Sequence, residues 1–154
     1  MFNYPKFIIT LLLIFSSTSS FAVDVTVNNA WIREAPPVSQ VQAAYAVINN
    51  NNQKNDIQLI SANSSAYKKI EFHQTVLENG VNKMLHQSSI TIPHNSHVTL
   101  KPEGMHMMLF NPVKPLRAGE EVTITFEFSD NSTTTQNFLV KKSTGTNSHH
   151  HMHH

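Results

Sequence analysis

The sequence contains no cysteine, and this absence excludes several kinds of site and anchor. Without cysteine the chain has no disulfide framework and no thiolate ligand for a metal. A lipoprotein anchor is likewise not expected, because it needs a cysteine after the apolar leader. In an oxidising compartment the absence has a further consequence, since thioethers and imidazoles are not lost to disulfide formation as thiolates are. A metal site in this chain has to use other side chains.

Charge is also scarce and almost balanced. Charged residues make up 14% of the chain, which has 11 basic and 10 acidic residues. A net charge near zero gives no electrostatic reason to expect nucleic acid or stable membrane association. No Ser-His-Asp set, paired carboxylates or phosphate-binding loop stands out, so we do not expect an enzyme.

The first 22 residues have the pattern of a secretory signal peptide. Lys6 places a positive charge ahead of an apolar run at positions 7–15, and Ser20-Phe21-Ala22 fits the small-x-small pattern of a cleavage point. The run is shorter than the roughly 20 residues that a membrane-spanning helix needs. The alternative is a buried N-terminal element, which the flanking residues disfavour. We therefore predict secretion and a mature chain from about Val23.

The mature sequence has the pattern of short strands. Apolar and polar residues alternate most clearly at 122–128, where Val122, Ile124, Phe126 and Phe128 are expected to face inward. Further strands are expected at 24–28, 43–48, 57–60, 97–100 and 133–140, with one helical turn at 64–69. Short strands separated by turn signals predict an all-β sandwich or barrel, with residues 23–142 as a single domain.

A β-hairpin is predicted around Asn79-Gly80, because Asn-Gly between two apolar-containing runs is the strongest short-range hairpin signal. With these two residues at the centre of the turn, Thr75 faces Met84 and His73 faces His86. His73 and Met84 are then diagonal neighbours on one face, where long side chains reach a common ion. A different turn length would shift this register.

A second pair of candidate ligands lies downstream, in Met105-His106-Met107-Met108. If this stretch is extended, His106 and Met108 share one face, whereas Met105 and Met107 point to the other and pack inward. An imidazole beside a thioether is a soft, neutral ligand pair that suits Cu(I). Mg²⁺ and Ca²⁺ prefer oxygen ligands, and Zn²⁺ seldom takes a thioether.

The four candidate ligands have a specific spacing. Ten residues separate His73 from Met84, 21 separate Met84 from His106, and one separates His106 from Met108. The sequence resembles in this respect the His-x10-Met-x21-His-x-Met pattern of the periplasmic copper chaperone family often called PCuAC. The resemblance extends to Ala30-Trp31-Ile32-Arg33, Pro36-Pro37, Ala43-Ala44-Tyr45, Leu100-Lys101-Pro102-Glu103-Gly104 and Pro115-Leu116-Arg117-Ala118-Gly119-Glu120.

The resemblance implies a cupredoxin-like Greek-key β-sandwich that binds Cu(I) through His73, Met84, His106 and Met108. It also implies a function: a periplasmic, monomeric chaperone that passes copper by ligand exchange to a haem–copper oxidase subunit, with the CuA centre as the most often proposed recipient. Another copper chaperone is a further possible partner. Because such folds rest on an apolar core, we expect the copper-free protein to be folded.

The C-terminal segment, residues 143–154, is expected to be a flexible tail. It ends in a metal-binding tract by composition, which suits Cu(II) better than Cu(I). A purification tag is the alternative, but a methionine interrupts the run, and this favours a native tail. The tract consists of His149, His150, His151, Met152, His153 and His154.

Other interpretations remain open. Taken singly, Met84 is more typical of a core residue that fills a gap, and His73 of a hydrogen-bonded strand residue. His86 faces His73 and is either a substitute ligand or, more simply, a surface residue, whereas His94 and His97 are expected to be solvated. The alternative functions are a periplasmic copper buffer without a dedicated recipient, and a metal-free secreted interaction domain.

Overall fold

The structure is a computed structural model that describes residues 24–142, and all regular structure in this range is β-strand. This part of the chain holds no helix long and apolar enough to cross a membrane. The predicted signal peptide (1–22) and the predicted tail (143–154) lie outside the described residues. The strands are β1 (Val25–Arg33), β2 (Val41–Asn50), β3 (Ile57–Asn63), β4 (Tyr67–Glu78), β5 (Val81–Gln87), β6 (Ile90–Ile92), β7 (Ser96–Leu100), β8 (Met105–Pro112), β9 (Glu121–Phe128) and β10 (Thr133–Lys141).

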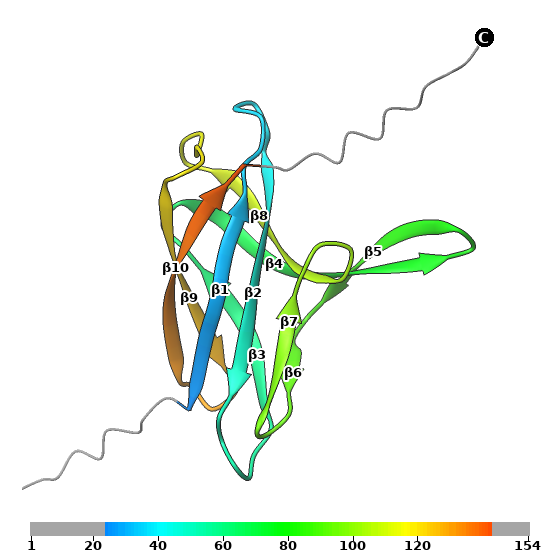
Figure 1. Ribbon diagram of the computed structural model, residues 1–154, viewed down its shortest axis with the longest axis vertical. Helices are drawn as coiled ribbons and strands as arrows, with labels where there is room; N and C mark the ends of the chain where they lie inside the picture. Colours follow the sequence, from blue (N-terminus) through cyan, green and yellow to red (C-terminus); the bar gives the residue numbers. More distant parts are fainter. Residues whose placement is uncertain (1–23, 143–154) are drawn as a thin grey trace, which may run out of the picture.

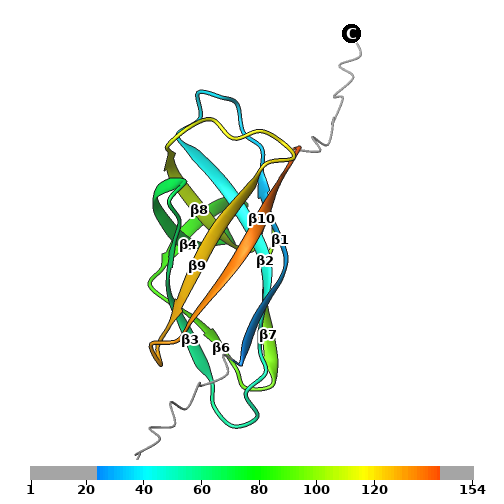
Figure 2. The same cartoon turned by 90° about the vertical axis from the view of Figure 1, so that its left-hand side faces the viewer.

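The strands form one hydrogen-bonded sheet that folds over on itself, as Figure 1 shows. Its order is β5-β4-β8-β2-β1-β10-β9-β3-β6. The first half of β2 pairs with β8, and its second half pairs with β7. β1 and β10 run parallel, whereas the other described pairs are antiparallel. In Figure 2, β9 and β10 lie in front of β2 and β8, so the sheet makes two layers.

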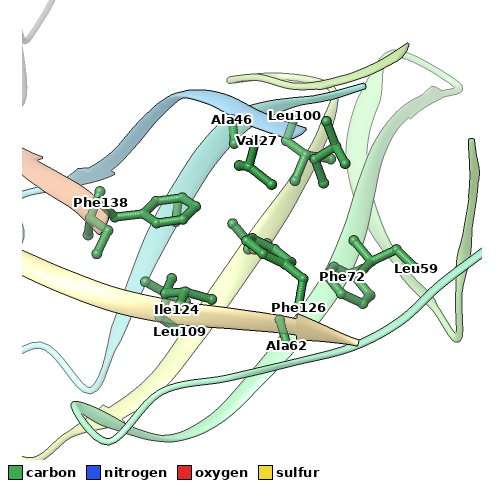
Figure 3. Close-up of a cluster of buried hydrophobic side chains, with 14 of the residues drawn as sticks. Val27, Ala46, Leu59, Ala62, Phe72, Leu100, Leu109, Ile124, Phe126 and Phe138 are labelled. Atoms are coloured by element: carbon green, nitrogen blue, oxygen red, sulfur yellow. The ribbon is translucent and has the colours of Figure 1, made fainter. Parts of the chain in front are cut away.

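The space between the layers is filled by apolar side chains (Figure 3). Phe126 of β9 and Phe138 of β10 are fully buried, with ring centroids 6.0 Å apart. Leu109 of β8 and Phe72 of β4 meet them from the other layer. Each such side chain contributes about 1.5–3 kcal/mol when fully buried. The fold therefore rests on apolar burial, and the strand alternation predicted for 122–128 is confirmed.

The predicted helical turn at 64–69 is wrong. The Ser64 hydroxyl accepts the N–H of Ala66, and the Ser64 carbonyl accepts the N–H of Tyr67, so this stretch turns only briefly. From Tyr67 onward the chain is strand β4, whose Lys69 pairs with Phe110 of β8. Pairing with β8 supplies the backbone hydrogen bonds that a single isolated helical turn would leave unmade.

The predicted hairpin is confirmed, with β4 and β5 in the expected register. Asn79 and Gly80 have φ angles of 52° and 77°, as the central residues of a type I′ turn require. Beyond Thr75, β4 pairs with β5 alone, so the tip projects from the body of the molecule, as Figure 1 shows. The tip exposes several apolar side chains, including Leu77 and Val81.

Candidate metal site

The candidate site begins where β4 pairs with β8. His73 of β4 lies directly opposite His106 of β8, and Glu71 lies opposite Met108. Residues paired in this way project to the same face of an antiparallel sheet, as do residues two apart along a strand. His73, His106 and Met108 therefore share one face. The two imidazole ring centroids are 6.2 Å apart.

Strand β5 brings the fourth predicted ligand to the same face from the other side of β4. Met84 pairs with Thr75, which is two residues along β4 from His73. Met84 is 60% exposed, because β5 is the edge of the sheet and nothing described covers its outer face. The structure thus places His73, Met84, His106 and Met108 on one face of three neighbouring strands. Met84 is the side chain with the most freedom to move.

A carboxylate fixes the orientation of His73. The Nε2 atom of His73 is 2.9 Å from Oε2 of Glu71, and Oε1 of Glu71 is 2.7 Å from Nζ of Lys69. The hydrogen bonds from Lys69 and His73 lower the pKa of Glu71 to about 2. An ionised carboxylate only accepts hydrogen bonds, so Nε2 of His73 carries the proton. The Nδ1 atom of the neutral ring is left with its lone pair.

That Nδ1 atom has no partner. Among the buried side-chain nitrogens and oxygens of residues 24–142, it is the one without a hydrogen bond. A buried polar atom without a partner costs about 1–3 kcal/mol, so it calls for an explanation. A nitrogen that faces a metal position satisfies this requirement, because a bound ion takes the place of the missing donor.

His106 is oriented in the complementary way. Its side chain is almost fully buried, and Nδ1 lies 2.9 Å from the carbonyl oxygen of Gly104. A carbonyl oxygen only accepts, so Nδ1 of His106 donates and Nε2 keeps the free lone pair of the neutral ring. His73 and His106 therefore present different nitrogens, each fixed by a hydrogen bond on the opposite side of the ring.

The remaining methionines of β8 differ in burial. Met107 is fully buried in the core, as expected, and Met105 is partly buried and packs against it. Met108 is partly buried on the outer face.

His94 and His97 are exposed, as predicted, and Nδ1 of His94 lies 2.8 Å from Asp56.

An aromatic pair adjoins the site, and the sequence interpretation did not include it. Trp31 of β1 pairs with Tyr45 of β2, and their ring centroids are 4.5 Å apart. Tyr45 alternates with Ala43, which pairs with Met108, so the aromatic pair lies on the outer face beside the ligands. Burial raises the pKa of Tyr45, which keeps the phenol neutral. The pair supplies an apolar border on the β2 side of the site.

Glu71 is the other residue that sequence reasoning missed. The available signal was its position two residues before His73, on the same face of a strand. Within the described range, no three His, Asp or Glu side chains are close enough to hold a metal together. The arrangement instead offers two oriented nitrogens, two thioethers and one ionised carboxylate that contacts a nitrogen ligand.

Comparisons with known proteins agree with this fold. The model of the LpqE-like family, described as "Putative lipoprotein LpqE-like", matches residues 25–140. "Putative lipoprotein Lxx21020" of Leifsonia xyli subsp. xyli (strain CTCB07) is 36% identical over 124 residues, which cover 80% of this chain and 73% of that protein.

Two solved structures resemble the chain. The copper-bound PCuAC domain from PmoF2 has a TM-score of 0.66 at 21% identity, over 79% of this chain and 97% of that domain. The solution structure of CuI-DR1885 from Deinococcus radiodurans has a TM-score of 0.59 at 26% identity, over 84% and 85%. The expected cupredoxin-like all-β fold is thereby confirmed. Since the family model spans nearly all of the described residues, the chain belongs to the LpqE-like family.

Proposed function

We propose that this protein is an exported Cu(I) chaperone that binds one ion through His73, Met84, His106 and Met108. The observation that carries the proposal is the placement of these four residues on one face of β5, β4 and β8. The unpartnered, buried Nδ1 atom of His73 supports it from an independent direction.

The donor chemistry favours Cu(I) over other ions. Two thioethers and two neutral imidazoles form a soft set, and Cu(I) is the soft ion among the common biological metals. Four neutral ligands leave the single positive charge of Cu(I) uncompensated. The ionised Glu71, which contacts His73, provides a negative charge close to the site without coordinating the ion.

The comparisons support copper as the cargo. The two similar solved structures are of copper-bound forms, one of them with Cu(I). Export is supported by the leader pattern of the first 22 residues, and by the description "putative lipoprotein" that the family and one relative carry. Delivery to a respiratory oxidase copper centre, such as CuA, is the finer part of the proposal and rests on the family resemblance.

The position of Met84 supports transfer rather than storage. Its side chain is exposed on an edge strand, and thioethers hold copper less tightly than thiolates do. A recipient ligand approaching from the solvent side would meet Met84 first. Met84 would then leave the ion while His106, which is buried, still holds it.

A competition titration with a Cu(I)-specific chromogenic chelator tests copper binding. We expect one tightly bound Cu(I) at the folded domain, and at least tenfold weaker binding when Met84 and Met108 are both changed to leucine. Leucine keeps the volume of methionine but removes the sulfur. Met105→Leu, on the other face of β8, is the matched control and should bind as the wild type does. Equal affinity of the double variant and the control would refute the proposed site.

Delivery is tested by deleting the gene under low and high copper. A chaperone predicts loss of oxidase activity at low copper, which added copper restores. A buffer without a dedicated recipient predicts copper sensitivity alone. The second outcome would retain the binding site but overturn the delivery function.

A further inference from the structure

Three histidines form a row across the candidate site. His106 on β8 pairs with His73 on β4, and His73 pairs with His86 on β5. The ring of His86 stands edge-on to that of His73 with centroids 5.6 Å apart, and the ring of His106 lies 6.2 Å from His73 on the other side. All three imidazoles thus lie on the outer face of neighbouring strands. His86 is exposed on the edge strand.

The nitrogens that are free in this row suit a single ion above the central strand. Strands lie about 4.8 Å apart, so an ion above β4 is roughly 5 Å sideways from the backbones of β5 and β8. The outer imidazoles must then use Nε2, which lies farther from the backbone, and the central imidazole must use Nδ1, which lies nearer. These are the atoms that the hydrogen bonds to Glu71 and Gly104 leave free: Nδ1 of His73 and Nε2 of His106.

The third imidazole has to move to reach the ion. The three rings do not converge in the present conformation. His86 is exposed, and its ring stands edge-on to that of His73, so it has room to rotate about its χ angles toward the solvent side. Metal bonds to imidazole nitrogen are about 2.0–2.1 Å long, so the rotation has to bring a nitrogen of His86 to that distance from an ion held by His73 and His106.

We propose that His86 is a third nitrogen ligand, which gives the site a second coordination mode for Cu(II) through His73, His86 and His106. Three imidazoles form a harder set than two imidazoles and two thioethers, and Cu(II) has the highest affinity of the divalent first-row ions for nitrogen donors. His86 and Met84 are two residues apart on the same face of β5. The hairpin therefore offers a sulfur to Cu(I) and a nitrogen to Cu(II). The inference rests on the proposed function only in taking His73 and His106 as donors.

Paramagnetic broadening in NMR spectra of the full chain tests this mode. Cu(II) broadens amide signals near its binding site, so a site on β4, β5 and β8 is distinguished from any site on the C-terminal histidine tract. With one equivalent of Cu(II) or more, we expect broadening around His73, His86 and His106. In His86→Gln this broadening should need at least about tenfold more Cu(II), whereas the Cu(I) affinity should change less than twofold.

His97→Gln is the matched control, because His97 is also an exposed strand histidine but lies on β7. It should behave as the wild type does with both ions. The Met84→Leu, Met108→Leu variant should show the reverse of His86→Gln: weaker Cu(I) binding and unchanged Cu(II) broadening. Unchanged Cu(II) broadening in His86→Gln, or broadening confined to the tail, would overturn the inference and leave the Cu(I) site intact. If the wild-type chain failed to bind Cu(I) but still showed Cu(II) broadening at the three histidines, the proposed function would be overturned and this inference would stand.

Discussion

At the scale of single residues, Glu71 decides which nitrogen of His73 is available. Its carboxylate accepts a hydrogen bond from Nε2 of His73 at 2.9 Å and is itself paired with Lys69 at 2.7 Å. Partners of this kind set the tautomer and orientation of metal-binding histidines. Glu71 is therefore a positioning residue, which we expect to act on copper only through His73.

Changing Glu71 to glutamine should alter the tautomer of His73. The glutamine amide group is able to donate to Nε2 as well as accept from it, so the proton is no longer confined to Nε2. We expect the side-chain ¹⁵N shifts of His73 in the copper-free protein to move toward the Nδ1–H form, and Cu(I) affinity to fall about tenfold to a hundredfold. Glu127→Gln is the control, because Glu127 accepts a hydrogen bond from Ser61 away from the site. An unchanged His73 tautomer with unchanged affinity would contradict this role.

The residues of the site were predictable to different degrees. The intervals between His73, Met84, His106 and Met108 identify candidate ligands, because a four-residue pattern with three fixed gaps is specific. Glu71 was not identified, since a carboxylate on a strand is ordinarily a solvated surface residue. The extended conformation of β4 puts Glu71 on the same face as His73, but only the side-chain conformations show that the two are hydrogen-bonded.

At the scale of elements, the β4–β5 hairpin is a projecting arm that carries Met84 and His86. Its turn depends on Asn79 and Gly80, both in the left-handed region. Since β5 pairs only with β4, the arm contributes little to the core, and its register matters chiefly for the site. A one-residue slip would move both side chains to the opposite face.

Changing Gly80 to valine should loosen this arm without unfolding the domain. A β-branched residue at φ 77° costs about 1–2 kcal/mol, although a Cβ there meets no neighbouring atom within 4 Å. We expect faster hydrogen exchange in β5 and weaker Cu(I) binding. Gly119→Val, at φ 95° in another turn, has the same backbone conflict and should leave Cu(I) affinity unchanged. Equal loss of copper affinity in both variants would show that the effect is general destabilisation.

The elements were predictable where local signals are strong. Asn79-Gly80 predicted the hairpin and its register, and alternation predicted β9. The stretch 64–69 was not predictable, because its short segment lacks a clear period and pairing with β8 decides its conformation. The order of strands in the sheet also depends on long-range pairing, as in the parallel contact of Trp31 with Leu139.

At the scale of the whole molecule, the core and the site are separate. Fully buried side chains such as Phe126 and Phe138 lie between the layers, whereas the predicted ligands lie on the outer face of one layer. Stability should therefore not require copper. Copper should raise the free energy of unfolding only as any ligand does that binds the folded state in preference to the unfolded one.

Changing Phe126 to alanine should destabilise the copper-free protein by about 3–5 kcal/mol, because it removes a fully buried ring and leaves a cavity. Met84→Ala, at an exposed position, should change stability by no more than about 0.5 kcal/mol. Urea unfolding followed by circular dichroism measures both values. Similar losses in the two variants, or an unfolded copper-free wild type, would contradict the separation of core and site.

Acid should destabilise the protein below about pH 4.5. Four carboxyl groups have pKa values that are lowered mainly by hydrogen bonds: Asp56, Glu71, Glu120 and Asp130. A lowered pKa in the folded state stabilises the fold above the unfolded pKa of about 4, and this stabilisation is lost as the pH falls through the folded value, about 2 for Glu71.

We expect the urea midpoint to fall between pH 4.5 and 2.5. Glu120→Gln should show a smaller fall, because its carboxyl group no longer contributes. A midpoint that stays constant or rises over this range would exclude a stabilising role for these carboxylates in the folded state.

X-ray absorption at the copper K-edge, with one equivalent of Cu(I), tests most directly whether two thioethers and two imidazoles meet at one ion. We predict a mixed shell of nitrogen and sulfur neighbours in the wild-type chain. In the Met84→Leu, Met108→Leu variant the sulfur contribution should disappear. A wild-type shell without sulfur, or a variant spectrum identical to that of the wild type, would contradict the assignment of the site.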